Sequence, residues 1–297
     1  MIRKALELLP EHISRAVILL DENLKREICE IRLRKDSVLS ISTYRKNLLI
    51  DINGKITSYI KDAVKCSGDD INYVINKLCE GSVYRYTNSI CSGYIVTREG
   101  IRAGVTGECA YDGGKISALV SFSSINLRIP HDVEGVGDKI SVFLTKNPTA
   151  SLLLIAPSGW GKTTIVRSVA KALSTGKFGR AKRVALIDER YEILPENAPS
   201  LIDRFAGYKK CDGIEIATRL FSPELIICDE IGYSDDVEAL LSVQNSGVPI
   251  LATTHGENAK SALLRPNVKR LVDSRVFDSF ARIERDENGV DIVFEEI

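Results

Sequence analysis

Residues 151–164, SLLLIAPSGWGKTT, constrain this chain more than any other stretch, because an apolar run leads into a glycine-bearing loop and a lysine. Residues 152–155 are all leucine or isoleucine, as in a strand buried on both faces of a parallel sheet. From Lys162 to Leu173, apolar residues recur at helical spacing. A strand, such a loop and a helix opened by Gly-Lys-Thr predict a phosphate-binding loop, since loop N–H groups and the helix N-terminus face one anion.

This loop predicts a site for ATP and Mg²⁺. The residues expected around the nucleotide are Ala156, Pro157, Ser158, Gly159, Trp160, Gly161, Lys162, Thr163 and Thr164. The Lys162 ammonium would reach the β- and γ-phosphates, and the Thr163 hydroxyl would be a ligand of Mg²⁺. The motif usually begins with glycine, and Ala156 at that position keeps it small but removes some backbone freedom. A loop that merely joins two elements would explain neither Lys162 nor the paired threonines.

Size and composition narrow the class of protein. A chain of 297 residues has room for two domains, and a hydrophobic content of 44% favours packed cores over disorder. Forty basic residues balance forty acidic ones, so nothing indicates a nucleic-acid partner. No apolar stretch is long enough for a membrane span, and the first residues lack the apolar run of a signal peptide. The seven cysteines contain no Cys-x-x-Cys pair, which favours reduced thiols in a cytosolic protein over a zinc site.

The second half of the chain alternates apolar runs with helical patterns. Further strands are expected at 183–187, 225–228 and 249–254, with helices at 214–221 and 237–243. This alternation predicts the fold class α/β, with residues 138–297 forming a RecA-like P-loop NTPase domain around a mostly parallel, doubly wound sheet. A helix at 138–146 would lead into the phosphate-loop strand, and residues 281–285 and 290–294 would form a closing hairpin.

Residues 1–137 predict a smaller α+β domain that precedes the NTPase domain. We expect helices at 11–20 and 69–78 and strands at 30–35, 38–41, 47–52, 93–97, 101–107 and 120–129. The second and third of these strands would pair with the first, and the next two would form a hairpin. The glycine-bearing stretch 132–137 marks the boundary between the domains. No metal cluster or catalytic constellation is evident in this half.

Acidic residues and a histidine follow the predicted strands of the second half, where ligands of parallel sheets bind. Asp229 would bind Mg²⁺, and Glu230 would orient or deprotonate the attacking water. Asp188 and Glu189 follow another strand, and Glu189 is a second candidate for water or metal contact. His255 could hydrogen-bond the γ-phosphate or a carboxylate. We expect all five residues to converge on the phosphate loop, although solvated strand ends would also account for acidic pairs.

Several stretches together resemble one family. They are the phosphate loop, SPELIICDEIG at 222–232, DER at 188–190, ATTHG at 252–256, EIRLR at 30–34, GIRAGVTG at 100–107 and SSINLR at 123–128. In this combination the chain resembles the stage III sporulation protein AA family over nearly its whole length. That family is similar to the hexameric secretion and pilus-retraction ATPases.

The resemblance implies a cytoplasmic, mother-cell ATPase that energises a trans-envelope channel to the forespore. It implies a homo-hexamer, membrane proteins of the channel as partners, and membrane association only through them. Related ATPases bind ATP between subunits and borrow arginines from a neighbour, for which the candidates are Arg102, Arg128, Arg190 and Arg219. We favour Arg128 because it ends a strand just before the linker. No arginine follows Lys162 at a spacing that obviously reaches back within the same chain.

Two other functions stay open on the sequence. A phosphate-loop kinase would transfer the γ-phosphoryl group to a small acceptor, but no arginine-rich lid insertion is evident. A nucleotide-dependent scaffold would bind ATP with little turnover.

Overall fold

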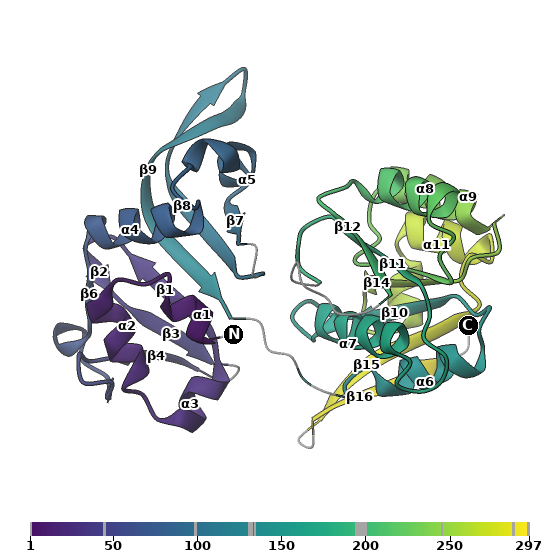
Figure 1. Cartoon of the computed structure of the whole chain (residues 1–297), viewed down its shortest axis with the longest axis horizontal. Helices are drawn as coiled ribbons and strands as arrows, with labels where there is room; N and C mark the ends of the chain where they lie inside the picture. Colours follow the sequence, from purple (N-terminus) through teal and green to yellow (C-terminus); the bar gives the residue numbers. More distant parts are fainter. Residues whose placement is uncertain are drawn as a thin grey trace. The chain divides into compact units, whose positions relative to one another are not determined.

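The computed structural model describes residues 2–43, 46–97, 100–129, 133, 135–193, 201–244, 246–286 and 289–295. The chain divides into two compact units, Met1–His131 and Asp132–Ile297 (Figure 1). Within the described part of the chain, no helix combines the length and the apolar character that crossing a bilayer requires.

The first unit is built on a seven-stranded antiparallel sheet in the order β5-β4-β3-β1-β9-β8-β7. Its strands are β1 (Ile28–Arg34), β3 (Ser40–Thr43), β4 (Asn47–Ile50), β5 (Ile56–Thr57), β7 (Tyr94–Val96), β8 (Arg102–Asp112) and β9 (Lys115–Arg128). A separate pair is formed by β2 (Ser37–Val38) and β6 (Lys65–Cys66). The helices are α1 (Ile2–Leu6), α2 (Glu11–Ile18), α3 (Glu22–Glu27), α4 (Gly68–Leu78) and α5 (Thr87–Cys91), with 3-10 turns at Ile60–Asp62 and Val83–Tyr86.

Alternation of apolar and charged residues places one face of this sheet in a core. In β1, Ile31 and Leu33 are buried in the same cluster as Ile13 of α2 and Ile71 of α4. The predicted helix at 69–78 is confirmed as α4, and its start is fixed by a reciprocal cap in which Ser67 and Asp70 bond each other's backbone N–H.

The predicted pairing of residues 38–41 with 30–35 is confirmed by β3 and β1, but one other pairing and the length of one strand need correction. β1 pairs with β3 and β9, whereas β4 pairs with β3 and β5, because alternation shows which face is buried but not which strands are neighbours. The strand expected at 120–129 begins at Lys115 and pairs with β8 as far as Asp112. Figure 1 shows this hairpin as a two-stranded ribbon extending beyond the rest of the sheet.

The second unit contains a mixed seven-stranded sheet in the order β12-β11-β13-β14-β10-β15-β16, parallel except for the last pair. Its strands are β10 (Leu152–Ala156), β11 (Val184–Asp188), β12 (Ile202–Ala206), β13 (Leu225–Cys228), β14 (Ile250–His255), β15 (Ser279–Asp286) and β16 (Gly289–Glu295). Its helices are α6 (Asp138–Lys146), α7 (Lys162–Thr175), α8 (Lys210–Leu220), α9 (Ser234–Gln244), α10 (Ala259–Leu263) and α11 (Pro266–Asp273). The predicted α/β class is confirmed.

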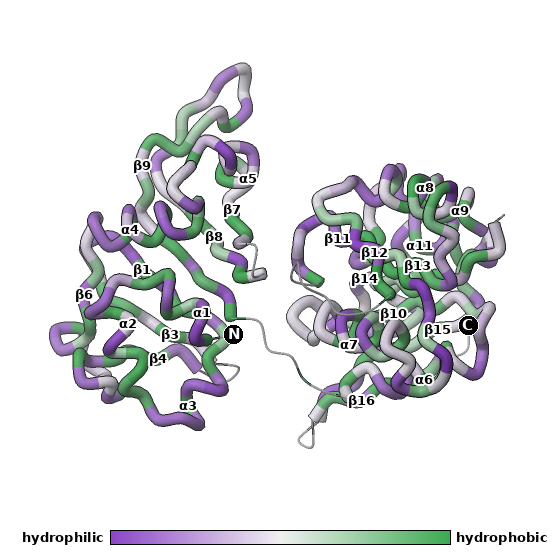
Figure 2. The backbone as a smooth tube through the Cα atoms, viewed as in Figure 1, coloured by the Kyte–Doolittle hydropathy of each residue, from purple (hydrophilic) through white to green (hydrophobic). Residues whose placement is uncertain are grey.

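Both faces of this sheet are covered. Leu152 and Leu154 of β10 share a cluster with α6 and α7, whereas Leu153 and Ile155 share a second cluster with α8, α9, α10 and α11. The central strands β10 and β13 are therefore apolar along their length, whereas β11 and β14 begin apolar and end in polar residues (Figure 2).

The second unit also departs from expectation at its edges. β15 forms the expected hairpin with β16 but also pairs in parallel with β10, so the hairpin extends the main sheet. The short edge strand β12, IDRFA, has two charged residues among five and carried no strand signal. Helix α8 begins at Lys210, before the expected start at Ile214.

No disulfide joins any two of the seven cysteines. Burial raises the pKa of Cys66 and Cys79 to about 11 and that of Cys228 to about 12. These three thiols therefore stay protonated and pack as small apolar groups.

Candidate functional site

The predicted phosphate loop joins the end of β10 to the start of α7. Gly159 and Gly161 have φ angles of +76° and +90°, and Gly161 is the residue that precedes the helix. A Cβ at either position would meet nothing within 4 Å, so these glycines are required by the backbone conformation and not by lack of space. Trp160 between them is half-buried against the core beneath α7.

Lys162 is folded back on the loop that it follows. Its side chain is 8% exposed, and Nζ donates to the carbonyl oxygens of Ala156 (2.7 Å) and Pro157 (2.9 Å). Burial lowers the pKa of Lys162 below its ordinary value, while the carboxylates of Asp229 and Glu230 oppose that shift. In this structure the Lys162 ammonium is therefore bound by backbone carbonyl oxygens of its own loop.

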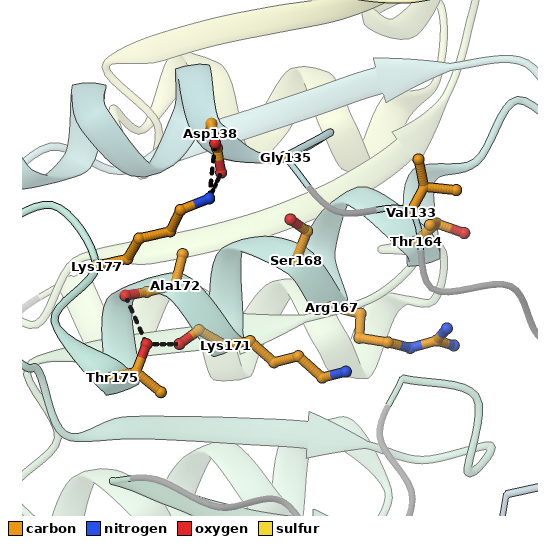
Figure 3. A pocket seen from close by; sticks show the side chains of 10 residues that line it. All are labelled: Val133, Gly135, Asp138, Thr164, Arg167, Ser168, Lys171, Ala172, Thr175 and Lys177. Atoms are coloured by element: carbon orange, nitrogen blue, oxygen red, sulfur yellow. Dashed lines mark hydrogen bonds and ion pairs between the residues drawn. The ribbon is translucent and has the colours of Figure 1, made fainter.

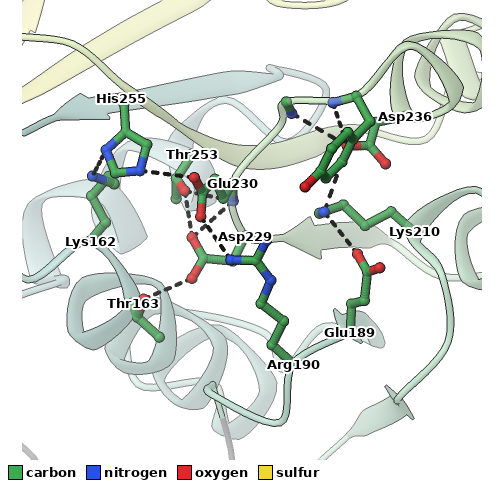
Figure 4. A network of polar contacts seen from close by, with 12 residues as sticks. Lys162, Thr163, Glu189, Arg190, Lys210, Asp229, Glu230, Asp236, Thr253 and His255 are labelled. Atoms are coloured by element: carbon green, nitrogen blue, oxygen red, sulfur yellow. Dashed lines mark hydrogen bonds and ion pairs between the residues drawn. The ribbon is translucent and has the colours of Figure 1, made fainter. Parts of the chain in front are cut away.

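Asp229, directly after β13, joins the loop to the centre of the sheet. Its Oδ2 accepts from the Thr163 hydroxyl at 2.7 Å, and its Oδ1 accepts from the Thr253 hydroxyl of β14 (Figure 4). Carboxylate and hydroxyl oxygens are the hard donors that Mg²⁺ prefers, so Thr163 and Asp229 fit the metal-binding role predicted for them.

Glu230 has a φ of +41°, which is uncommon for a residue with a side chain. The conformation is held by its N–H, which donates to Asp229 Oδ1 at 3.0 Å and to Thr253 Oγ1 at 2.9 Å. Its side chain lies between a histidine and an arginine: Oε1 is 2.9 Å from His255 Nε2, and Oε2 accepts from Arg190 Nη1 at 3.3 Å.

His255, at the end of β14, bridges the loop lysine and the strand-end carboxylate. Its Nδ1 lies 3.1 Å from Lys162 Nζ, and its other ring nitrogen faces Glu230. His255 therefore contacts both Lys162 and Glu230 (Figure 4).

The convergence predicted for five strand-end residues holds for three of them, Asp229, Glu230 and His255. Asp188 is 2% exposed and is bound by its own loop and by the neighbouring strand: it accepts from the N–H groups of Glu192 and Ile193 and from the guanidinium of Arg204 in β12. Glu189 accepts from Lys210 Nζ at 2.9 Å. A strand end places a residue at the correct edge of the sheet, but the partners of its side chain come from other elements.

Two residues of the site were not assigned to it from the sequence. Arg190 was expected only as an interface arginine, and no arginine was expected to reach the site within the chain, yet Arg190 contacts Glu230 in cis. Its place in the Asp-Glu-Arg stretch was the available signal. Lys210 carried no signal, because it precedes the apolar pattern of α8.

Two hollows lie near these residues in the second unit. A cavity of about 20 Å³, room for roughly one water molecule, lies between residues 187–193, Lys210 and the Asp229–Glu230 pair. A larger hollow of about 340 Å³ follows the outer face of α7 from Thr164 to Thr175, and Figure 3 shows Arg167, Ser168 and Lys171 along it. At its far end Lys177 forms an ion pair with Asp138 at 2.8 Å.

Arg128 lies in the first unit, at the end of β9 opposite Glu30 of β1. Its side chain is 61% exposed, and its Nε is 3.9 Å from a Glu30 oxygen. Glu30 is bound more closely by Arg32, with an Nε–Oε2 distance of 2.9 Å. The contact between Glu30 and the Arg128 guanidinium is therefore the weaker of the two.

Solved structures of two other proteins, an ATPase and a pilus retraction motor, share this fold. The Yersinia pseudotuberculosis ATPase DotB matches with a TM-score of 0.60 over 97% of this chain and 79% of that chain, at 16% identity. The pilus retraction motor PilT, solved with bound ADP, matches with a TM-score of 0.57 over 92% of this chain and 80% of that chain, at 17% identity. The chain shares its fold with these two proteins.

The family is shown by sequence. The family described as "Sporulation stage III, protein AA" matches residues 3–294, and the chain belongs to it. The Stage III sporulation protein AA of Bacillus subtilis (strain 168) is 28% identical over 287 residues, which cover 94% of this chain and 90% of that protein. The resemblance stated from the motifs is confirmed.

Proposed function

We propose that this chain is an ATP hydrolase whose residues 138–297 form a RecA-like domain that binds Mg-ATP at the phosphate loop. One observation carries the proposal: Lys162, Thr163, Asp229, Glu230 and His255, from distant parts of the sequence, form one hydrogen-bonded network at the ends of β10, β13 and β14. If the acidic residues were only solvated strand ends and the loop only a connection, a hydrogen-bonded network joining them would not be expected.

Each residue has a role that follows from its contacts. Lys162 exchanges the carbonyls of Ala156 and Pro157 for β- and γ-phosphate oxygens, and residues 156–164 surround the triphosphate. Thr163 and Asp229 hold Mg²⁺, which supplies positive charge for the phosphoryl oxygens. Glu230 orients the attacking water and accepts its proton. When Lys162 moves to the phosphates, His255 carries that change to Glu230.

Glu230 is a better candidate than Glu189 for the catalytic carboxylate. Glu230 follows Asp229 directly and is linked through His255 to Lys162. The carboxylate of Glu189 is bound by Lys210. Glu189 lines the small cavity next to Asp229 and Glu230 and does not act on the substrate directly.

The hollow along α7 offers room for the nucleoside. It begins at Thr164, next to the proposed metal ligand, and its volume of about 340 Å³ falls within the range of small-molecule sites. A nucleotide whose phosphates occupy the loop would extend its sugar and base in this direction.

The family and fold support a cellular role as well. The chain would act in the mother-cell cytoplasm as a homo-hexameric ring and would energise a channel to the forespore through membrane proteins. A nucleic-acid partner is not part of this proposal, since the net charge is zero.

Phosphate release from Mg-ATP tests the proposal, measured at rising protein concentration beside the mass of the assembly in solution. A turnover rate per chain that rises as rings form is expected. Mass spectrometry of the products separates hydrolysis from transfer to a small acceptor. ATP binding without turnover, in assembled rings, would favour a scaffold and contradict an ATPase.

A further inference from the structure

Lys210 is a buried ammonium group outside the phosphate loop. It is the first residue of α8 and is 5% exposed. Its Nζ lies 2.9 Å from Glu189 Oε2 and 3.6 Å from Asp236 Oδ2, and the Tyr233 ring is 5.9 Å away (Figure 4). The three charged side chains come from three elements: the loop after β11, the start of α8 and the start of α9.

The burial of Lys210 is poorly explained by a contribution to the stability of the fold. The N-terminus of a helix disfavours a cation, because the helix dipole is positive there. Removing the charged groups from water also offsets most of the electrostatic attraction between them. A buried ion pair is therefore often no more stabilising than apolar side chains of similar volume. A lysine in such a place is better explained by the geometry that it imposes.

The two carboxylates bound by Lys210 connect it to the segments after β11 and β13: Glu189 lies in the loop after β11, and Asp236, at the start of α9, bonds the segment after β13. Glu189 is followed by Arg190, whose guanidinium reaches Glu230. Asp236 accepts from the N–H groups of Gly232 and Tyr233, at 3.3 Å and 3.2 Å, and so holds the segment that follows Glu230. One ammonium thus ties the segment bearing Arg190 to the segment bearing Glu230.

We propose that Lys210 is a positioning residue for ATP hydrolysis, which sets the loops after β11 and β13 so that Arg190 and Glu230 meet at the proposed site. This inference rests on the proposed function. Lys210 reaches the reaction only through Glu189 and Asp236. Its loss shifts Glu230 relative to the triphosphate and leaves the phosphate-loop contacts in place.

The test compares Lys210→Met, Lys210→Arg and wild type in steady-state hydrolysis of Mg-ATP by the full chain. We expect Lys210→Met to lower kcat by about 10- to 100-fold, as displacement of catalytic groups by about 1 Å does, with KM changed less than about 2-fold. Lys210→Arg, which keeps the charge, recovers part of kcat. Lys182→Met is the matched control, because this buried lysine donates to Leu144 O, on the opposite face of the sheet. It should leave kcat near the wild-type value.

Coupling to Arg190 separates positioning from a general structural role. If Lys210 acts by placing Arg190 against Glu230, the variant carrying both Lys210→Met and Arg190→Ala hydrolyses ATP about as fast as the slower single variant. Losses of kcat that multiply would overturn the proposal, as would a kcat for Lys210→Met equal to that of wild type.

If Lys210→Met does not fold, the same kcat comparison is made with Asp236→Asn. This variant keeps the bonds from the N–H groups of Gly232 and Tyr233 and removes the charge that faces Lys210. A wild-type chain that releases no phosphate overturns both this inference and the proposed function, whereas active wild type with unaffected variants overturns this inference alone.

Discussion

Glu230 is the residue whose local geometry most favours a chemical role. A positive φ costs free energy for any residue with a Cβ, and such conformations persist where surrounding bonds impose them. Here the N–H of Glu230 is held by Asp229 and Thr253, and the carboxylate is turned toward His255 and Arg190. Strain of this kind at the end of a central strand is typical of functional sites.

Glu230→Gln keeps the shape of this side chain but cannot accept a proton. We expect the variant to bind ATP while its hydrolysis rate falls by roughly 10²-fold or more. Binding can be followed by the fluorescence of Trp160, the one tryptophan of the sequence, which lies within the phosphate loop. Glu189→Gln is the matched comparison, and a larger loss there than in Glu230→Gln would assign the catalytic carboxylate to the other strand end.

Lys162→Ala removes the cation that faces the proposed triphosphate site. Preorganised charges in a water-excluded site contribute about 3–4 kcal/mol each to the transition state, so turnover should fall by at least about 10²-fold. The fold should survive, because the Nζ of Lys162 bonds only loop carbonyls and a histidine at the end of the sheet. Phosphate release measured beside thermal melting checks both statements, and near-normal hydrolysis would contradict the phosphate-loop interpretation.

At the scale of elements, the packing of α6 on α7 holds the helix that begins at the phosphate loop. Gly137 precedes α6, and its N–H donates to Ser168 Oγ of α7 at 3.2 Å. A Cβ on Gly137 would lie 2.8 Å from Val169 Cγ2 and 2.9 Å from Val169 N. The two helices are therefore in contact through a glycine that leaves no space for a side chain.

Gly137→Ala should lower the free energy of unfolding of the second unit by about 1–3 kcal/mol, the usual cost of an extra methyl group in a filled site. Urea unfolding followed by Trp160 fluorescence reports on this unit. Gly232→Ala is the control, since a Cβ there would meet nothing within 4 Å. Equal unfolding midpoints for the two variants would show that α6 and α7 can separate without cost.

The elements that the sequence predicted well are those with a strong local signal. The all-apolar strands β10, β11 and β13 and the capped helix α4 fall within a few residues of expectation. The edge strand β12 and the parallel pairing of β15 with β10 depend on neighbours distant in sequence. For the same reason the network of Asp229 and His255 could be anticipated from strand ends, whereas the contacts of Arg190 and Lys210 could not.

At the scale of the whole molecule, the first unit has arginines on the face of its sheet that is turned away from its core. Arg32 and Arg34 of β1, Arg102 of β8 and Arg128 of β9 occupy positions on the face opposite Ile31 and Leu33. Glu30 lies among them and pairs with Arg32 and Arg128. A face with this excess of positive charge suits a contact with phosphate groups, and in a ring of identical chains those phosphates could belong to a neighbour's nucleotide.

Arg128 is the arginine of this face that we expect to act on a neighbouring subunit's ATP. The γ-phosphate develops charge that one lysine and one Mg²⁺ offset only in part, and an arginine supplied by another subunit contributes about 10³–10⁵ in rate in related reactions. Arg128→Ala should therefore bind ATP normally and hydrolyse it poorly, while Arg34→Ala on the same sheet face stays near wild type. Mixing Arg128→Ala with Lys162→Ala should restore part of the activity, because some interfaces then combine an intact phosphate loop with an intact Arg128. Native mass spectrometry verifies that mixed assemblies form, and mixed rings without recovered hydrolysis would mean that Arg128 acts within its own chain or only structurally.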